Sequence, residues 1–208
     1  MGEANFLAQY LQKPVPTGAG VIDTALFKRY NAPPKYFDYT FLSVDPASGT
    51  DSGSYSAIQK YGVVNGRLYL IWVTRGKWKF PALCDLIILN RTRQKIEHIV
   101  VERAGYGMAV LDELSGRLNM EDRYFNLHGM VPTTSKTHRM EQAMVTVTKN
   151  LVEIPQDAIG MPEFLNELEA FPTGKHDDQV DAFSQAVRFF RRLEDNMLKC
   201  DLTLIPRG

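Results

Sequence analysis

The segment Lys175-His176-Asp177-Asp178-Gln179-Val180-Asp181-Ala182 places three carboxylates within five residues. An apolar pattern with steps of three or four continues from this segment to Leu193 and predicts one face of a helix. The acids therefore fall on the first turn of a helix. Asp177 and Asp181 lie four residues apart on one side of that turn, and Asp178 is rotated away by about 100°.

Capping and the helix dipole explain one acid at a helix start well, but they explain three acids and a preceding histidine poorly. Clustered carboxylates repel one another unless a cation or solvent separates them. The segment therefore indicates a metal-binding or catalytic role, provided that other parts of the chain supply partners for it.

The composition describes a globular chain with balanced charge. Its 208 residues suit one domain, with 44% apolar and 23% charged residues. Lys plus Arg equals Asp plus Glu at 24 each, which argues against a surface that binds nucleic acid everywhere but allows a local basic groove. The two cysteines are far apart and are expected to be reduced thiols. No apolar run approaches the roughly 20 residues of a membrane span, so we expect no membrane contact.

The pattern along the chain predicts an α/β domain with a mixed central sheet. Residues 1–35 are expected to form a linker or approach segment, residues 36–195 the domain, and residues 196–208 a flexible tail. Within the domain we expect strands over 37–44, 55–64, 67–74, 96–101 and 124–127, and an edge strand or turn at 151–154. Helices are expected over about 23–30, 80–94, 108–118, 135–149 and 162–170, before the closing helix that ends near 193.

Two isolated acids follow predicted strands, Asp45 after the first and Glu102 at the end of the fourth. Ligands of open α/β sheets gather beyond the strand ends, so acids on two adjacent strands can converge with an acid-headed helix. Carboxylates that converge without a cysteine or histidine set form a hard oxygen site, which suits Mg²⁺ or Mn²⁺.

These residues together resemble the RNase H-like (retroviral-integrase-like) nucleases, and more specifically the nuclease domain of the large terminase subunit of tailed bacteriophages. The resemblance covers about residues 4–192 and implies a three-layer RNase H-like fold. It is carried by the two strand-end acids and by four sequence segments, namely Phe171-Pro172-Thr173-Gly174-Lys175-His176-Asp177-Asp178-Gln179-Val180-Asp181-Ala182, Lys136-x-x-Arg139, Glu167-Leu168 and Phe6-x-x-Gln9-Tyr10-Leu11-Gln12-x-Pro14.

The resemblance implies a metal-dependent endonuclease that cuts concatemeric double-stranded viral DNA during packaging. Asp45, Glu102 and Asp177 take the metal-ligand positions, Asp178 and Asp181 are further ligand candidates, and Asp181 joins the first three as a catalytic candidate. Two Mg²⁺ or Mn²⁺ ions are expected. The implied partners are an N-terminal ATPase domain, the small terminase subunit and the portal, in the host cell cytoplasm. No phosphate loop of the Gly-x-x-x-x-Gly-Lys-Ser/Thr kind is present, so we expect no ATPase activity.

Basic residues near the acids are candidates for contacts with DNA phosphates. Lys136, Arg139 and Lys79 are predicted to bind DNA, with a solvated helix face as the competing interpretation. The three arginines of the closing helix could line the same groove, but we expect them to pair with Glu194 and Asp195; they are Arg188, Arg191 and Arg192.

Two alternative functions stay open at this point. The same fold could act on another substrate, as a junction resolvase, an RNase H or a transposase core. The chain could also be a catalytically silent module that docks other packaging proteins.

Overall fold

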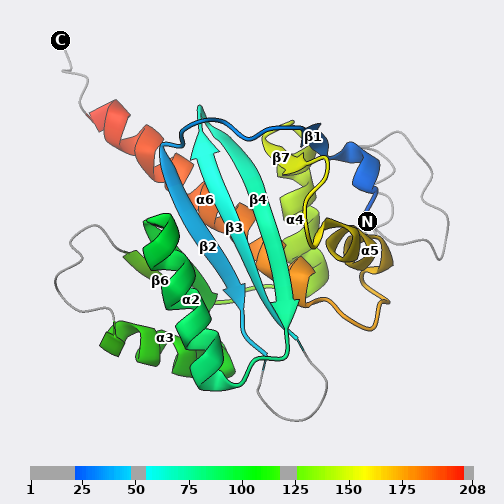
Figure 1. The fold of residues 1–208 in the computed structure, drawn as a ribbon. Helices are drawn as coiled ribbons and strands as arrows, with labels where there is room; N and C mark the ends of the chain where they lie inside the picture. Colours follow the sequence, from blue (N-terminus) through cyan, green and yellow to red (C-terminus); the bar gives the residue numbers. More distant parts are fainter. Residues whose placement is uncertain (1–21, 48–54, 118–125, 204–208) are drawn as a thin grey trace.

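The computed structural model describes residues 22–47, 55–117 and 126–203, with side chains described as far as residue 196. Within these ranges the chain forms three layers, with helices on both faces of a seven-stranded mixed sheet (Figure 1). This architecture confirms the predicted α/β class. None of the helices in the described ranges is long and apolar enough to cross a membrane.

The strands follow the predicted order, with one addition at the start. They are β1 (Lys28–Tyr30), β2 (Tyr39–Asp45), β3 (Ser56–Val64), β4 (Arg67–Gly76), β5 (His98–Glu102), β6 (Asn126–Met130) and β7 (Val152–Pro155). The segment expected as an edge strand or turn is therefore a strand, and it lies inside the sheet between β1 and β4.

Five α-helices and a short 3-10 helix are present in the described ranges. They are η1 (Thr24–Leu26), α2 (Phe80–Gln94), α3 (Tyr106–Arg117), α4 (Lys136–Thr148), α5 (Met161–Ala170) and α6 (Asp178–Thr203). Pro81 stands at the start of α2 and Pro162 at the start of α5, where a missing backbone N–H costs nothing. Ser135 caps α4 by accepting a hydrogen bond from the amide of His138.

The sheet order is β1-β7-β4-β3-β2-β5-β6, and only β3 runs antiparallel to its neighbours. The β3–β4 hairpin turns at Asn65 and Gly66, whose φ angles of 51° and 67° are both positive, as a type I′ turn requires. Strands β2 and β5 lie side by side and parallel, with Val44 opposite Val101. The two strand ends that carry Asp45 and Glu102 therefore meet at one edge of the sheet.

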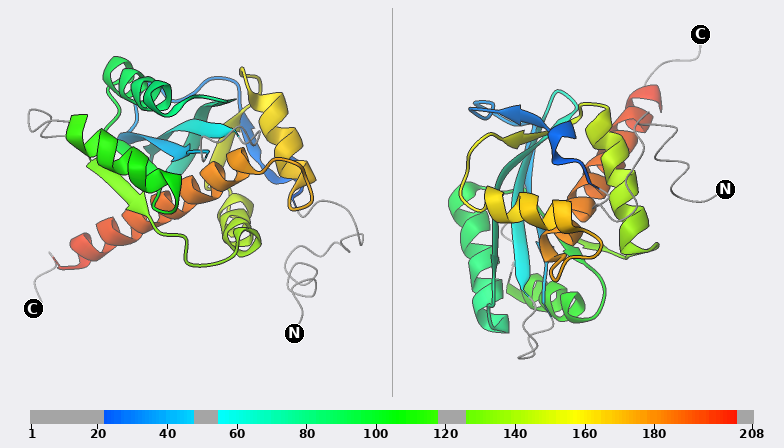
Figure 2. Two further views of the ribbon diagram at one scale, coloured as in Figure 1. Left: turned by 90° about the horizontal axis from the view of Figure 1, so that it is seen from below. Right: turned by 90° about the vertical axis from the view of Figure 1, so that its right-hand side faces the viewer.

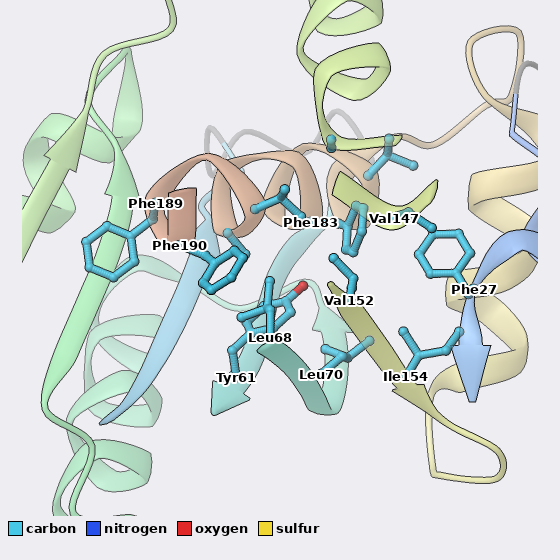
Figure 3. Close-up of a cluster of buried hydrophobic side chains, with 14 of the residues drawn as sticks. Phe27, Tyr61, Leu68, Leu70, Val147, Val152, Ile154, Phe183, Phe189 and Phe190 are labelled. Atoms are coloured by element: carbon cyan, nitrogen blue, oxygen red, sulfur yellow. The ribbon is translucent and has the colours of Figure 1, made fainter. Parts of the chain in front are cut away.

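The larger core lies between the sheet and α6, with α4 and α5 beside that helix (Figure 2). The phenylalanines of α6 point onto the sheet, as the close-up shows (Figure 3). The residues that form this contact are Phe183, Phe189 and Phe190 from α6 with Tyr61, Leu68 and Leu70 from β3 and β4. Each buried aromatic or leucine side chain contributes about 1.5–3 kcal/mol of transfer free energy, so this contact fixes α6 on the sheet.

The smaller core lies on the opposite face, under α2 and α3. Strand β2 serves both cores because its side chains alternate: Phe41 belongs to the α6 side, and Leu42 and Val44 belong to the α2 side. The helix residues of the smaller core are Leu83, Cys84 and Ile87 from α2 with Val110 and Leu114 from α3.

The ends of the domain differ from the predicted boundaries. Part of the predicted linker, residues 1–35, belongs to the sheet, because β1 pairs in parallel with β7 and Phe27 is buried in the larger core. The helix expected over about 23–30 is wrong; a single 3-10 turn and strand β1 occupy that stretch. Helix α6 continues to Thr203, into the predicted tail. The expected motor-domain join at Phe6–Pro14 lies outside the described residues.

Candidate active site

The acids at the sheet edge point toward α6 because of strand alternation. On β2, Phe41 and Ser43 face α6, so Asp45 two residues further faces the same side. On β5, Val100 belongs to the larger core, so Glu102 also faces α6. The Oγ atom of Ser43 donates to the carbonyl oxygen of Ala182 at 2.7 Å, which fixes the first turns of α6 directly over the end of β2.

The first turn of α6 is held in place by a buried polar network. The backbone N–H of Gln179 donates to Glu167 Oε1 at 2.6 Å, and the Gln179 side-chain Nε2 donates to Oε2 at 2.9 Å. Arg75 of β4 donates to the same carboxylate at 2.7 Å. Gln59 of β3 donates to the Gln179 carbonyl oxygen at 2.9 Å. Elements α5, β3 and β4 thus fix the helix start, whose acids face the strand ends.

Gln185 joins α6 to both acid-bearing strands, and sequence reasoning did not single it out. Its Nε2 lies within hydrogen-bonding distance of Ser43 Oγ at 3.0 Å and of the carbonyl oxygens of Val44 and Val100 at 3.2 and 3.3 Å. A signal was present in the sequence, because Gln185 falls four residues after Asp181 and shares its helix face. A polar residue at that position of a buried helix face indicates a positioning contact.

The carboxylates raise one another's pKa because they converge. Burial raises the pKa of Asp45 well above its usual range, and the charges of Asp181, Glu102 and Asp178 raise it further. Burial also raises the pKa of Glu102, with Arg139 opposing and Asp181 adding to the shift. Burial, Glu167 and Asp177 raise the pKa of Asp178. The helix acids and the strand-end acids therefore share one electrostatic site.

Two cations from α4 neutralise part of this cluster. Lys136 Nζ lies 2.7 Å from Asp177 Oδ2 and 2.6 Å from Asp181 Oδ2. Arg139 Nη2 lies 2.8 Å from Asp181 Oδ1 and 3.5 Å from Glu102 Oε2. Burial alone would lower the pKa of Lys136, but its hydrogen bonds to the two aspartates raise the pKa above its usual value. Asp181 is thus the central acid of the helix, with 8% of its side chain exposed against 38% for Asp177.

The remaining candidates lie at the periphery. Asp178 is hydrogen-bonded by the backbone of Tyr55, and its Oδ2 lies 3.9 Å from Nδ1 of His176. The Tyr55 ring packs edge-on against His176 with 5.1 Å between centroids. Lys79 is exposed just before α2, which covers the opposite face of the sheet, and it makes none of the contacts that join Lys136 and Arg139 to the acids.

Gly107 allows the close approach that positions Glu102. A Cβ atom on Gly107 would lie 1.9 Å from the carbonyl oxygen of Glu102, far inside van der Waals contact. Helix α3 can therefore begin directly against the end of β5 only with glycine at this position.

The donor set fits a hard divalent cation in type and charge. Asp45, Glu102, Asp178 and Asp181 offer only carboxylate oxygens, and their raised pKa values reflect a concentration of negative charge that a cation would relieve. Across the described part of the chain, no three Asp, Glu, His or Cys side chains are already grouped to hold an ion. Lys136 and Arg139 contact the acids instead.

A mixed sheet with one antiparallel strand, helices on both faces and acids at the ends of two central strands defines an RNase H-like α/β domain. The sequence matches the family model of the terminase RNaseH-like domain over residues 42–188, which is more than two thirds of the chain, so the chain belongs to that family. This confirms the family and the fold class that the sequence motifs predicted.

Solved structures of terminases share the fold at low sequence identity. The large terminase nuclease from thermophilic phage G20c, crystallised with bound cobalt, has a TM-score of 0.58 and 16% identity, with 83% of this chain and 98% of that chain covered. The human cytomegalovirus terminase nuclease domain, soaked with manganese and inhibitor-bound, has a TM-score of 0.56 and 12% identity, covering 78% and 89% of the two chains.

The large terminase from a second thermophilic bacteriophage has a TM-score of 0.60 and 13% identity. The match covers 82% of this chain and 45% of that large terminase, so this chain spans less than half the length of that protein. No curated protein sequence matches this chain.

Proposed function

We propose that this domain is a divalent-metal-dependent endonuclease that cuts concatemeric double-stranded DNA during viral DNA packaging. The observation that carries the proposal is the convergence of Asp45, Glu102, Asp178 and Asp181 at one end of the sheet, where burial and mutual repulsion raise the pKa of Asp45. Terminase nucleases of the same fold have been crystallised with cobalt or magnesium and soaked with manganese, which supports the choice of a divalent cation.

Asp45, Glu102, Asp178 and Asp181 would hold Mg²⁺ or Mn²⁺, with two ions expected. Of the three helix acids, Asp178 and Asp181 influence the pKa of Asp45, whereas the more exposed Asp177 is engaged by Lys136. We therefore favour Asp178 and Asp181 as ligands and Asp177 as a residue that holds Lys136. When bound, such ions supply an activated water and neutralise charge on the phosphate under attack.

The chain's own cations would orient the DNA. Lys136 and Arg139 already contact the acids, and either can turn one N–H group toward a phosphate oxygen while keeping a carboxylate contact. Arg139 suits this role because its planar guanidinium can bond a carboxylate and a phosphate at once. Lys79, on the opposite face of the sheet, would contact DNA only further from the acids.

The larger protein around this domain is also part of the proposal. The large terminase from the second thermophilic bacteriophage, which is more than twice as long as its matched part, was crystallised with ADP. Its bound nucleotide supports an ATPase domain elsewhere in proteins of this kind. By this analogy the domain acts beside an N-terminal ATPase, the small subunit and the portal in the host cytoplasm. The zero net charge of the chain suits a nuclease that receives DNA from an attached motor.

Plasmid cleavage tests the proposal. We expect supercoiled plasmid to be nicked and linearised in Mn²⁺, with cleavage abolished by a chelator. An uncut plasmid under all divalent conditions would overturn the nuclease proposal in favour of a silent docking module. A four-way junction or an RNA–DNA hybrid cut in preference to plain duplex would overturn the terminase substrate and leave the metal chemistry standing.

A further inference from the structure

A groove between α4 and α6 adjoins the acid cluster. It contains a cavity of about 120 Å³. A smaller cavity of about 10 Å³ is lined by Glu102 and Gln185 among others. Arg139 and Arg188 line both cavities, so the two form one path that leads from Glu102 away from the strand ends. Helices α4 and α6 lie side by side along this path (Figure 2).

The larger cavity has a strongly one-sided charge. The charged side chains that line it are three guanidinium groups, and no carboxylate is among the lining residues. They belong to Arg139 on α4 and to Arg188 and Arg191 on α6. The path therefore changes from negative at Glu102 to positive at Arg191 within one groove.

Arg188 and Arg191 are not committed to acidic partners in the way that Arg139 is. Arg188 donates to the carbonyl oxygen of Val131 at 2.8 Å, a neutral acceptor. Arg191 lies 3.9 Å from Asp195, beyond hydrogen-bonding distance. The expected pairing of these arginines with Glu194 and Asp195 is thus limited to one loose contact among the described residues.

The cavity suits an oxyanion. Its volume is several times the space that one water molecule needs. Guanidinium groups bind phosphate oxygens through paired N–H donors, and hydroxyl and amide groups commonly complete such sites. The lining supplies three groups of that kind, from Gln142, Thr146 and Ser184.

We propose that Arg188 and Arg191 form a phosphate subsite that holds the DNA backbone beside the acid cluster. This inference rests on the proposed nuclease function, because the path joins the subsite to the acids that would cleave the strand. Phosphate contacts fix the register and orientation of a duplex without reading its sequence. The subsite would thereby orient a strand whose next phosphates pass over Asp45 and Glu102.

Fluorescence anisotropy of a labelled duplex in chelator measures this binding without cleavage. We expect the Arg188→Gln/Arg191→Gln double variant to bind at least about tenfold more weakly at low salt and to reduce the slope of log affinity against log salt by about two. The single variant Arg191→Gln, which leaves the Arg188–Val131 bond intact, should reduce the slope by about one. Melting curves check that each variant is folded.

Arg192→Gln is the matched control, because it removes the same charge from the next residue of α6, which does not line the cavity. We expect this variant to bind within about twofold of the wild type. Equal losses in the Arg192 and Arg191 variants would overturn the subsite and indicate a diffuse charge effect. Inorganic phosphate should compete with DNA for the wild type more strongly than chloride does at equal ionic strength; equal competition would also count against the subsite.

The subsite and the nuclease function can fail separately. If the wild type cuts plasmid but the double variant binds DNA normally, the subsite is wrong and the nuclease proposal stands. If no plasmid is cut but the double variant loses DNA binding, the subsite stands and the domain binds DNA without cutting it.

Discussion

Glu167 caps helix α6 from a different helix: its Oε1 accepts the backbone N–H of Gln179 at 2.6 Å, twelve residues away along the chain. The same carboxylate is buried and pairs with Arg75 at 2.7 Å. A negative charge at this position also complements the positive end of the α6 dipole. The acid-bearing turn is therefore fixed by the fold before any ligand binds.

We expect Glu167→Gln to lower the free energy of unfolding by about 3 kcal/mol, because it leaves the Arg75 charge buried without its partner. Denaturant unfolding followed by circular dichroism measures the change. The control is Glu113→Gln, which breaks the more exposed pair with Arg117 and should cost about 0.5 kcal/mol or less. Equal losses for the two variants would show that Glu167 does not hold the helix start.

We expect Lys136→Gln to lower the melting temperature by about 2–4 °C in chelator, because Asp177 and Asp181 lose a shared cation. Saturating Mn²⁺ should narrow this deficit, since a bound cation neutralises the same acids. Lys149→Gln, at the exposed end of α4, should show neither effect. A Lys136 deficit that Mn²⁺ leaves unchanged would mean that the lysine and the metal do not share these acids.

We expect Gly107→Ala to cost roughly 2 kcal/mol or more and to weaken any metal-induced rise in melting temperature, because its methyl group would collide with the Glu102 carbonyl and displace Glu102. The control is Gly116→Ala in the same helix, where nothing lies within 4 Å of the added Cβ atom. That change should be neutral or stabilising by up to about 1 kcal/mol. Matching results for the two glycines would contradict the close-approach account.

Stability should fall as the pH drops from 6.5 toward 4, because of a half-buried histidine pair. His98 Nδ1 lies 3.1 Å from His128 Nε2, against Phe189 of α6. Burial, His98 and Arg192 lower the pKa of His128 to about 4, and burial lowers the pKa of His98 although Glu97 opposes it. The folded state binds fewer protons than the unfolded state in this window, so the contribution present above pH 6.5 is lost on acidification.

Melting temperatures across this pH range test the histidine account. His128→Gln should show a shallower fall than the wild type, and His138→Gln, which changes an exposed residue of α4, should keep the full fall. An unaltered fall in the His128 variant would assign the pH dependence to other groups.

Local patterns predicted most of the fold because its elements have strong periodicity. The bounds of α2 matched the prediction at both ends, and Asn65-Gly66 forms the expected hairpin turn. Strand β1 was missed because it has three residues and joins the sheet only through β7, more than 120 residues away in the sequence. Such a pairing leaves no local periodic signal.

The same distinction holds for the site. The convergence of Asp45 and Glu102 could be predicted, because both end strands that the α/β pattern makes neighbours. The choice among the helix acids could not, because it depends on how α4 packs beside α6. Helix geometry grouped Asp177 with Asp181, whereas in the fold Asp181 is buried between Lys136 and Arg139 and Asp177 is half exposed.

The central claim is that the converged acids hold the cation that cuts DNA, and the rate of duplex cleavage by Asp45→Asn in Mn²⁺ tests it most directly. The matched control is Asp85→Asn, whose carboxylate is exposed and pairs with Arg117 away from the acid cluster. The account predicts that Asp45→Asn is folded, melts at or above the wild-type temperature in chelator, and cleaves at least about a hundredfold more slowly, while Asp85→Asn cleaves normally. Wild-type cleavage by a folded Asp45→Asn protein would contradict the account.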